Sequence, residues 1–307
     1  MIHADGFKER YMNIYTDFGF KMLFGTEVNK DLLMSFLNAL LHDEQHIVDL
    51  AYLNAEHLGT GEGDRRAVFD IYCENDRGEK FIVEMQKAAQ RFFKDRSVFY
   101  STFPIREQAQ RGDWNFELKA VYTIGILNFV FDEDAGGEDC YHHEVKLVDV
   151  NRNRVFFDKL NFIYLEMPKF RKTEAELVTM YDKWMFVLRN LSSLLDRPAA
   201  LQERVFAKLF RAAEIARFTP VQRSEYEESL KVYRDLNNVI DTAKWQGREE
   251  GHAEGLEEGL AKGRAEGRVK GREEGIRDVA LQMKRQGLPA EVIAQCTGLS
   301  QAEVEGL

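Results

Sequence analysis

The 307-residue sequence has few cysteines and no long apolar run, and both absences restrict what the protein can be. Its three cysteines, Cys73, Cys140 and Cys296, are far apart and odd in number, which argues against a disulfide framework or a zinc cluster. No stretch of about 18 apolar residues is present to cross a bilayer. The first residues also lack an apolar signal region. We therefore expect a cytoplasmic protein with reduced thiols and no membrane partner.

An excess of positive charge is also missing, since the formal net charge is −10. Affinity for phosphate backbones comes mainly from lysine and arginine, so this balance argues against a protein whose whole surface binds nucleic acid. A local basic patch is compatible with it. Lys87, Arg91, Lys94 and Arg96 stand against one acidic residue in a single stretch. This stretch is either a DNA contact or the solvated face of a helix.

The most informative feature is a pair of apolar runs joined by a glycine-containing turn, VFDIYCENDRGEKFIVEMQ, at residues 68–86. Both runs alternate with period 2, which is typical of β-strands. A three-residue loop over 76–78, with Gly78 in the left-handed conformation, joins them into a hairpin. This loop pairs Asn75 with Glu79 and so fixes the register of the two strands.

Alternation along the hairpin gathers polar side chains on one face. The register sets Asp70 directly opposite Glu84, with Cβ atoms about 4.5–5.5 Å apart, and Gln86 follows two positions later. The same alternation predicts that Phe69 faces away from Asp70, together with Ile71.

Two carboxylates that meet on a largely apolar sheet repel and raise each other's pKa unless a cation lies between them. Oxygen ligands suit a hard divalent ion, so Asp70 and Glu84 are candidate ligands of Mg²⁺ or Mn²⁺. The alternative is a half-exposed hairpin whose acids point into solvent. That alternative must also explain why the acids share a face with Val68 and Ile82, in strands apolar enough to be central.

Several segments together resemble the PD-(D/E)xK nuclease superfamily. The hairpin carries an acid in an apolar strand, then thirteen residues, then the tripeptide EMQ. Four further segments are similar to the Rpn branch of recombination-promoting nucleases, also called PD-(D/E)xK family transposases. They are YTDFGFKMLFG at 15–25, NKDLLMSFLNALL at 29–41, KDRSVFYST at 94–102 and VYTIGILNF at 121–129. The resemblance extends over about residues 10–275 and is more specific than two acids alone.

The resemblance implies metal-dependent cleavage of DNA phosphodiester bonds by a protein linked to recombination or mobile elements. Carried over position by position, it makes Asp70 and Glu84 the metal-binding acids. It places Gln86 among the catalytic residues, and it matches Asp17 to a further family position.

Gln86 is the main departure from the superfamily pattern, because it stands where the superfamily has a lysine. A lysine there can orient the attacking water or stabilise the developing charge on phosphate. An amide can still hydrogen-bond water, and Lys21 or Lys87 can supply charge from a neighbouring position.

The order of the expected elements predicts an α/β fold. Helices are expected over 29–41 and over 88–111, the second one kinked or split at Pro104. Strands are expected over 47–54, in the hairpin, and in the nearly all-apolar run 118–130. Helix, meander, helix and strand in this order form the core of a restriction-endonuclease-like (PD-(D/E)xK) sandwich with a helical C-terminal extension.

We expect four segments along the chain. They are a nuclease-like core at 1–170, a helical cap at 171–245, a glycine-periodic segment at 246–276 and a small helical unit at 277–307. In the cap, Thr173 and Glu176 form a capping box that opens a helix. The last segment is expected to form three short helices.

In the third segment a glycine recurs every fourth residue from Gly247 to Gly275. Each internal glycine costs about 1 kcal/mol of helix stability relative to alanine, so a helix here needs a partner. A row of glycines permits close backbone approach, and we expect a homo-oligomer formed through this segment. A flexible, highly charged linker is the alternative.

Two functions from different classes fit these observations. The first is a metal-dependent DNA endonuclease. The alternative is a catalytically weak DNA-binding or assembly protein that retains the nuclease fold. An inactive fold has no need of both Asp70 and Glu84, and both are present.

Overall fold

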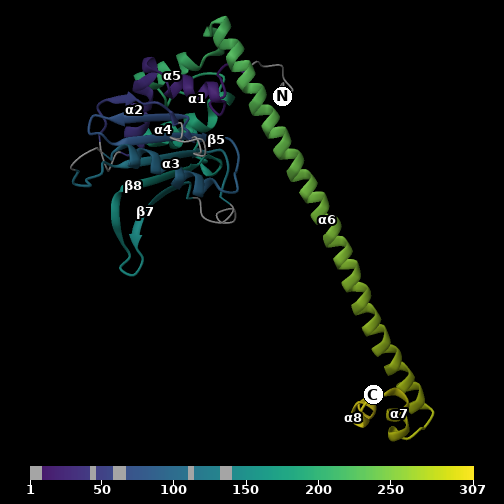
Figure 1. Cartoon of the computed structure of the whole chain (residues 1–307). Coiled ribbons are helices and arrows are strands. Elements are labelled where there is room, and N and C mark those ends of the chain that lie inside the picture. The colour runs from purple at the N-terminus through teal and green to yellow at the C-terminus, as the bar shows by residue number, and fades with distance from the viewer. Residues whose placement is uncertain (1–8, 42–45, 58–66, 110–113, 132–139) are drawn as a thin grey trace, which may run out of the picture. The chain divides into compact units, whose positions relative to one another are not determined.

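The computed structural model describes residues 9–41, 46–57, 67–109, 114–131 and 140–307 (Figure 1). Its strands are β1 Leu50–Tyr52, β2 Glu56–His57, β3 Ala67–Val68, β4 Ile71–Asn75, β5 Lys80–Gln86, β6 Val121–Leu127, β7 His142–Asp149 and β8 Arg154–Glu166. Its α-helices are α1 Asp17–Phe24, α2 Lys30–Leu40, α3 Phe93–Glu107, α4 Met180–Asn190, α5 Arg204–Ala213, α6 Pro220–Arg285, α7 Ala290–Thr297 and α8 Gln301–Glu305.

Within the described residues, six strands form one mixed sheet in the order β1-β4-β5-β6-β8-β7. The strands β1, β4 and β5 form an antiparallel meander, whereas β5, β6 and β8 are parallel to one another. The antiparallel strand β7 lies at the edge beside β8. Every residue of β6 is buried, as expected for a central strand covered on both faces.

Helices cover both faces of this sheet. The main core joins one face to α1, α2, α4 and α5, through aromatic contacts that include those of Trp184 with Phe24, Phe36 and Phe206. On the other face α3 packs through Phe93, whose ring lies 5.5 Å from that of Tyr164 on β8. The predicted α/β sandwich is therefore confirmed.

Two local predictions were wrong. The helix expected to begin near residue 88 begins at Phe93, and α3 is not split at Pro104, which lies only one turn before the last helical residue. The expected end of that helix, residues 110–111, lies outside the described residues. The predicted capping box of Thr173 and Glu176 is confirmed, but it opens only a one-turn 3₁₀ helix and not the expected longer one. Helix α4 begins later, under a second capping box formed by Thr179 and Asp182.

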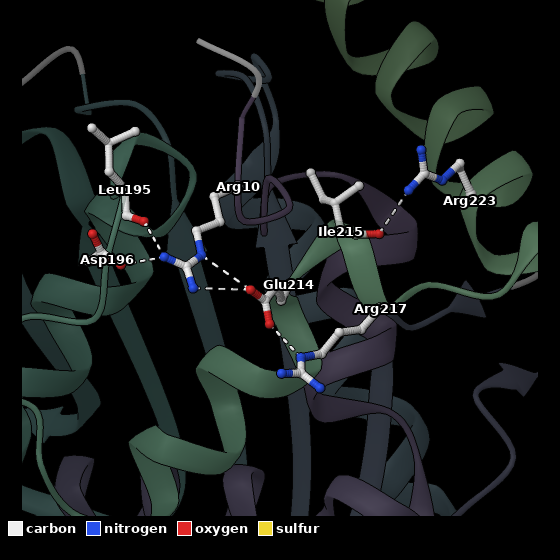
Figure 2. A network of polar contacts seen from close by, with 7 residues as sticks. All are labelled: Arg10, Leu195, Asp196, Glu214, Ile215, Arg217 and Arg223. Carbon is white, nitrogen blue, oxygen red and sulfur yellow. Dashed lines mark hydrogen bonds and ion pairs between the residues drawn. The ribbon is translucent and has the colours of Figure 1, made fainter.

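A polar network ties the first described residues to the helices that follow the sheet (Figure 2). The Arg10 guanidinium donates to Glu214 Oε1 from Nε at 3.2 Å and from Nη2 at 3.1 Å, and it also pairs with Asp196. Arg217 holds the second oxygen of Glu214. Residues 1–235 accordingly form one compact unit.

A second compact unit comprises residues 236–307. Helix α6 is 66 residues long and continues through the whole glycine row. A small cluster of Ala280, Ile293 and Val304 then packs the end of α6 against α7 and α8. The first of the three short helices expected here is therefore the end of α6. Among the described residues, no helix is both long and apolar enough to cross a membrane.

Candidate active site

The loop between β4 and β5 has the predicted geometry. Gly78 has a φ of +77°, a left-handed conformation that a side chain would strain. The Asn75 N–H donates to the Glu79 carbonyl at 3.0 Å, and the ladder continues to Ile71 opposite Val83. One further step in this register puts residue 70 opposite residue 84, as the sequence predicted.

Hydrogen bonds connect the three polar residues of the hairpin. The Asp70 N–H donates to Glu84 Oε1 at 3.2 Å, and Gln86 Nε2 donates to Glu84 Oε2 at 3.0 Å. The Met85 N–H donates to Asp70 Oδ2 at 2.8 Å. In this register Met85 would otherwise bond to the carbonyl of Phe69. The Asp70 side chain thus replaces a ladder partner directly before the first residue of β4.

The side chain of Phe69 does not lie on the face that the predicted alternation gave it. Phe69 lies between β3 and the start of β4, and its N–H donates to the Ala55 carbonyl at 2.9 Å. Its side chain packs with Tyr72 and Ile82 rather than with Ile71, which belongs to the main core. The break between β3 and β4 removes the simple period-2 relation, since β3 pairs with β2 and not with the main sheet.

Burial and like charge set the electrostatics of the acid pair. Burial, followed by the charge of Asp70, raises the pKa of Glu84 to about 8. Burial also raises the pKa of Asp70, and the hydrogen bond from Met85 opposes that rise. The hydrogen bond from Gln86 is among the weaker influences that favour the charged form of Glu84.

Among the described residues, Glu166 is a buried acid that, unlike Asp70 and Glu84, has a cation at hydrogen-bond distance. It ends β8 in the same row as Gln86 and, like Glu84, it is buried. Burial opposes its charged form, yet its pKa is lowered, because Lys169 Nζ lies 2.8 Å away and the Phe131 N–H and His143 also contribute. A cation at hydrogen-bond distance thus stabilises a buried carboxylate here. A divalent cation between Asp70 and Glu84 would do the same.

The donor set fits such an ion. Mg²⁺ commonly binds through one or two carboxylates and completes its shell with water and substrate phosphate. Asp70 and Glu84 supply two carboxylates, and Gln86 adds an amide. Among the described residues, no group of three or more His, Cys, Asp or Glu side chains could hold a metal. Two carboxylates and an amide would leave positions in the shell of such an ion for water and substrate phosphate.

The segment DFGFK brings further charges to Asp70. Thr16 caps α1 by accepting a bond from the Gly19 N–H at 3.0 Å, and a Cβ at Gly19 would lie only 2.4 Å from a backbone oxygen. Asp17 and Lys21 form an ion pair of 2.9 Å one turn apart. Both act on the pKa of Asp70, which Asp17 raises and Lys21 lowers.

A groove of about 650 Å³ lies beside these residues. Asp17, Lys21 and Lys87 line it from α1 and from the end of β5, and the first turns of α6 form its other wall with Glu225 and Glu228. Lys87 also lowers the pKa of Asp70. The two lysines named as alternatives to the superfamily cation therefore both act on Asp70.

The other three predicted DNA-contact residues occupy two places. Arg96 lines a small hollow with Glu84, and its charge lowers the pKa of that acid. Lys94 lies over the Phe131 ring at 4.4 Å, and Arg91 lies over Phe92 at 5.3 Å. Those two basic residues line a separate hollow of about 320 Å³.

Two residues near Glu84 were missed from the sequence. Tyr100, one helical turn after Arg96, lines the same hollow, and the charges of Glu84 and Asp70 help burial to raise its pKa. Gly125 lies directly beside Glu84 on β6, where a Cβ would lie 3.1 Å from the Tyr164 ring. Two sequence signals could have found them. Tyr100 follows Arg96 by four residues and so lies on the same face of α3, and Gly125 is a glycine inside an apolar strand, which often marks a close approach of other groups.

A mixed sheet between helices, with one acid on β5 and another directly before the neighbouring β4, is typical of PD-(D/E)xK nuclease folds. Residues 14–243 match the family model described as PD-(D/E)XK nuclease family transposase, and the chain belongs to this family. The resemblance inferred from the sequence is thereby confirmed. No curated protein and no solved structure gives a significant match to the chain.

Proposed function

We propose that the protein is a metal-dependent DNA endonuclease of the Rpn branch, associated with recombination or mobile elements. The observation that carries this proposal is the contact of Asp70 with the buried Glu84. The charge of Asp70 raises the pKa of Glu84, and a buried carboxylate beside a second one is costly in a fold. The two carboxylates are explained if Mg²⁺ or Mn²⁺ binds between them during the reaction.

The chain's own residues have distinct roles in this proposal. Asp70 and Glu84 would hold the ion, which when bound supplies an activated water and neutralises charge on the phosphate. Gln86 restrains Glu84 through its Nε2 and orients water with its amide. Asp17 fixes Lys21 through their ion pair, and both belong to the wall of the groove where the phosphate would lie.

Lys21 and Lys87 take over the charge that the missing lysine would supply. Both lower the pKa of Asp70, so their ammonium groups act on the space where a phosphate bound to the shared ion would lie. Positive groups fixed beside a developing negative charge stabilise the transition state without reorganisation. Arg96 provides a third positive charge, near Glu84.

Nicking of supercoiled plasmid tests the proposal. The purified full-length protein should nick plasmid with Mg²⁺ or Mn²⁺ and should not nick it with EDTA. Asp70→Ala should abolish nicking, whereas Glu79→Gln, a change of another acid in the same hairpin, should leave it intact. Equal nicking by wild type and Asp70→Ala would refute the assignment.

A second candidate function, an assembly or DNA-binding protein of low activity, is favoured by the glycine row of α6. A Cβ built at any of these eight glycines, from Gly247 to Gly275, meets no atom within 4 Å beyond its chain neighbours and the nearby backbone of its own helix. Within the described part of residues 236–307, nothing thus packs against the row. We propose that a second copy of the same segment covers it and makes the protein a homo-oligomer.

We also propose a cytoplasmic location. Cys73, Cys140 and Cys296 are all free thiols. Cys73 is buried in the core, where burial raises its pKa to about 12 and keeps it unreactive. Exposed free thiols such as Cys140 and Cys296 are typical of proteins kept in a reducing compartment.

A further inference from the structure

A small hollow lies beside Glu84, between the sheet and α3. Thr123 and Gly125 of β6 line it from the sheet, and Gly125 is the register partner of Glu84. Helix α3 covers it with residues that include Arg96. The hollow has a volume of about 10 Å³, which is close to the space that one water molecule needs. No larger ligand fits there.

Two polar atoms at this hollow have no hydrogen-bond partner among the described residues. They are Thr123 Oγ1 and Arg96 Nη2. Both atoms are buried, and Thr123 as a whole is only 3% exposed, so bulk solvent does not reach its hydroxyl. A buried polar atom without a partner is costly, and an ordered water commonly supplies that partner. Two such atoms at one hollow therefore point to a ligand that they share.

The polar groups around these two atoms already have partners. Ser97 Oγ donates to the Phe93 carbonyl at 3.0 Å and is also hydrogen-bonded to the Tyr164 hydroxyl. The Arg96 guanidinium is held at its other end, where Nη1 donates to Gln90 Oε1 at 2.6 Å. It also lies 5.6 Å from the centre of the Phe93 ring. Arg96 is thus fixed in place by contacts that do not use Nη2.

Glu84 supplies a third polar group to the hollow. The charge of Arg96 lowers the pKa of Glu84, whereas the hydrogen bonds that Glu84 accepts from the described residues come from the Asp70 N–H and from Gln86 Nε2. An ionised carboxylate can accept about four hydrogen bonds, so both oxygens of Glu84 have capacity left. Polar groups that interact without a direct hydrogen bond are commonly joined by a water.

We propose that one water molecule binds in this hollow, hydrogen-bonded to Thr123, Arg96 and the Glu84 carboxylate, and that Thr123 and Arg96 are thereby positioning residues for Glu84. The ligand must be neutral, because Arg96 repels a cation and Glu84 repels an anion. A water both donates and accepts, so it can satisfy all three groups. The inference rests on the proposed function, since the carboxylate that the water holds is a ligand of the shared ion. Groups that orient such a ligand are typically worth about 10–100-fold in metal affinity.

Binding of Mn²⁺ to the full-length protein without DNA tests the positioning role. Thr123→Val keeps the β-branched shape and removes the hydroxyl, and it should weaken Mn²⁺ binding about tenfold. Thr123→Ser keeps the hydroxyl and should bind Mn²⁺ as tightly as wild type. Ser101→Ala removes another buried hydroxyl of α3, outside the hollow, and should change nothing. Equal affinity of wild type and Thr123→Val, or equal loss in Thr123→Val and Thr123→Ser, would overturn the role.

A double variant tests whether Thr123 and Arg96 act through one water. Arg96→Lys should also weaken Mn²⁺ binding, because a lysine lacks the fork that reaches both Gln90 and the hollow. Residues that share one partner have effects that do not add. The combination of Arg96→Lys with Thr123→Val should therefore bind Mn²⁺ about as well as the weaker single variant. Losses that multiply in the double variant would contradict a shared water.

A crystal structure of the metal-free full-length protein tests the water by itself. One water should lie within about 3.2 Å of Thr123 Oγ1, Arg96 Nη2 and a Glu84 oxygen. A direct bond between Arg96 and Glu84 that closes the hollow, or a hollow without a water, would overturn the inference even where Mn²⁺ binds. The proposed function fails by a different result, namely a wild type that binds no Mn²⁺ and nicks no plasmid, whatever the hollow contains.

Discussion

Replacing Glu84 by glutamine is expected to stabilise the metal-free protein at neutral pH. The pKa of this acid rises from 4.5 to about 8 through burial and the charge of Asp70. The folded state therefore binds an extra proton between these values, and the wild type loses stability as the pH rises through that window. At pH 7.5, about three units above the unfolded pKa, the cost is on the order of 4 kcal/mol.

Glutamine removes this cost and can keep both hydrogen bonds of the site. The side-chain oxygen of the new glutamine still accepts from the Asp70 N–H. Its NH₂ group can donate to the side-chain oxygen of Gln86, once the Gln86 amide has turned over. We expect Glu84→Gln to raise stability by about 2–4 kcal/mol at pH 7.5, which is several degrees in Tm for a unit of this size. The difference should shrink to about 0.4 kcal/mol near pH 4.5, where Glu84 is protonated in the folded chain and about half protonated in the unfolded chain.

Thermal unfolding in EDTA at the two pH values measures this effect. Glu166→Gln is the matched control, because its pKa is shifted downward and its loss should destabilise the protein at pH 7.5. Adding Mn²⁺ should raise the Tm of the wild type and leave that of Glu84→Gln unchanged. A Glu84→Gln protein that melts lower than wild type at pH 7.5 would refute the reasoning.

Two further changes test other parts of the account. Gln86→Lys restores the superfamily cation and should support or increase plasmid nicking; loss of nicking with unchanged folding would show that this branch needs the amide itself. Leucine in place of three glycines should raise helix content by circular dichroism and abolish self-association by sedimentation, because it blocks close approach of two backbones. An unchanged oligomeric state would show instead that the row is a passive spacer. The three positions are Gly255, Gly259 and Gly263.

The hairpin that carries Asp70 and Glu84 could be predicted because its determinants are local. A glycine at position 78 and a strict alternation around it fix the register, and the register alone brings Asp70 opposite Glu84. The orientation of Phe69 could not be predicted in this way. It depends on the β2–β3 pair, whose contacts join residues far apart in the sequence.

The surroundings of the acid pair depend on packing that no local pattern shows. Tyr100 and Arg96 reach Glu84 only because α3 crosses that face of the sheet, and Gly125 is explained only by the rings packed around it. The length of α6 was also missed. Helix propensity predicts a weak helix over the glycine row, whereas the structure continues the helix through it.

Binding of Mn²⁺ tests most directly whether Asp70 and Glu84 share one ion. The free ion can be followed by its paramagnetic resonance while the full-length protein is titrated. The wild type should bind Mn²⁺ at a site that is lost in both Asp70→Asn and Glu84→Gln and retained in Glu79→Gln. Unchanged Mn²⁺ affinity in either of the first two variants would contradict the shared site and, with it, the proposed mechanism.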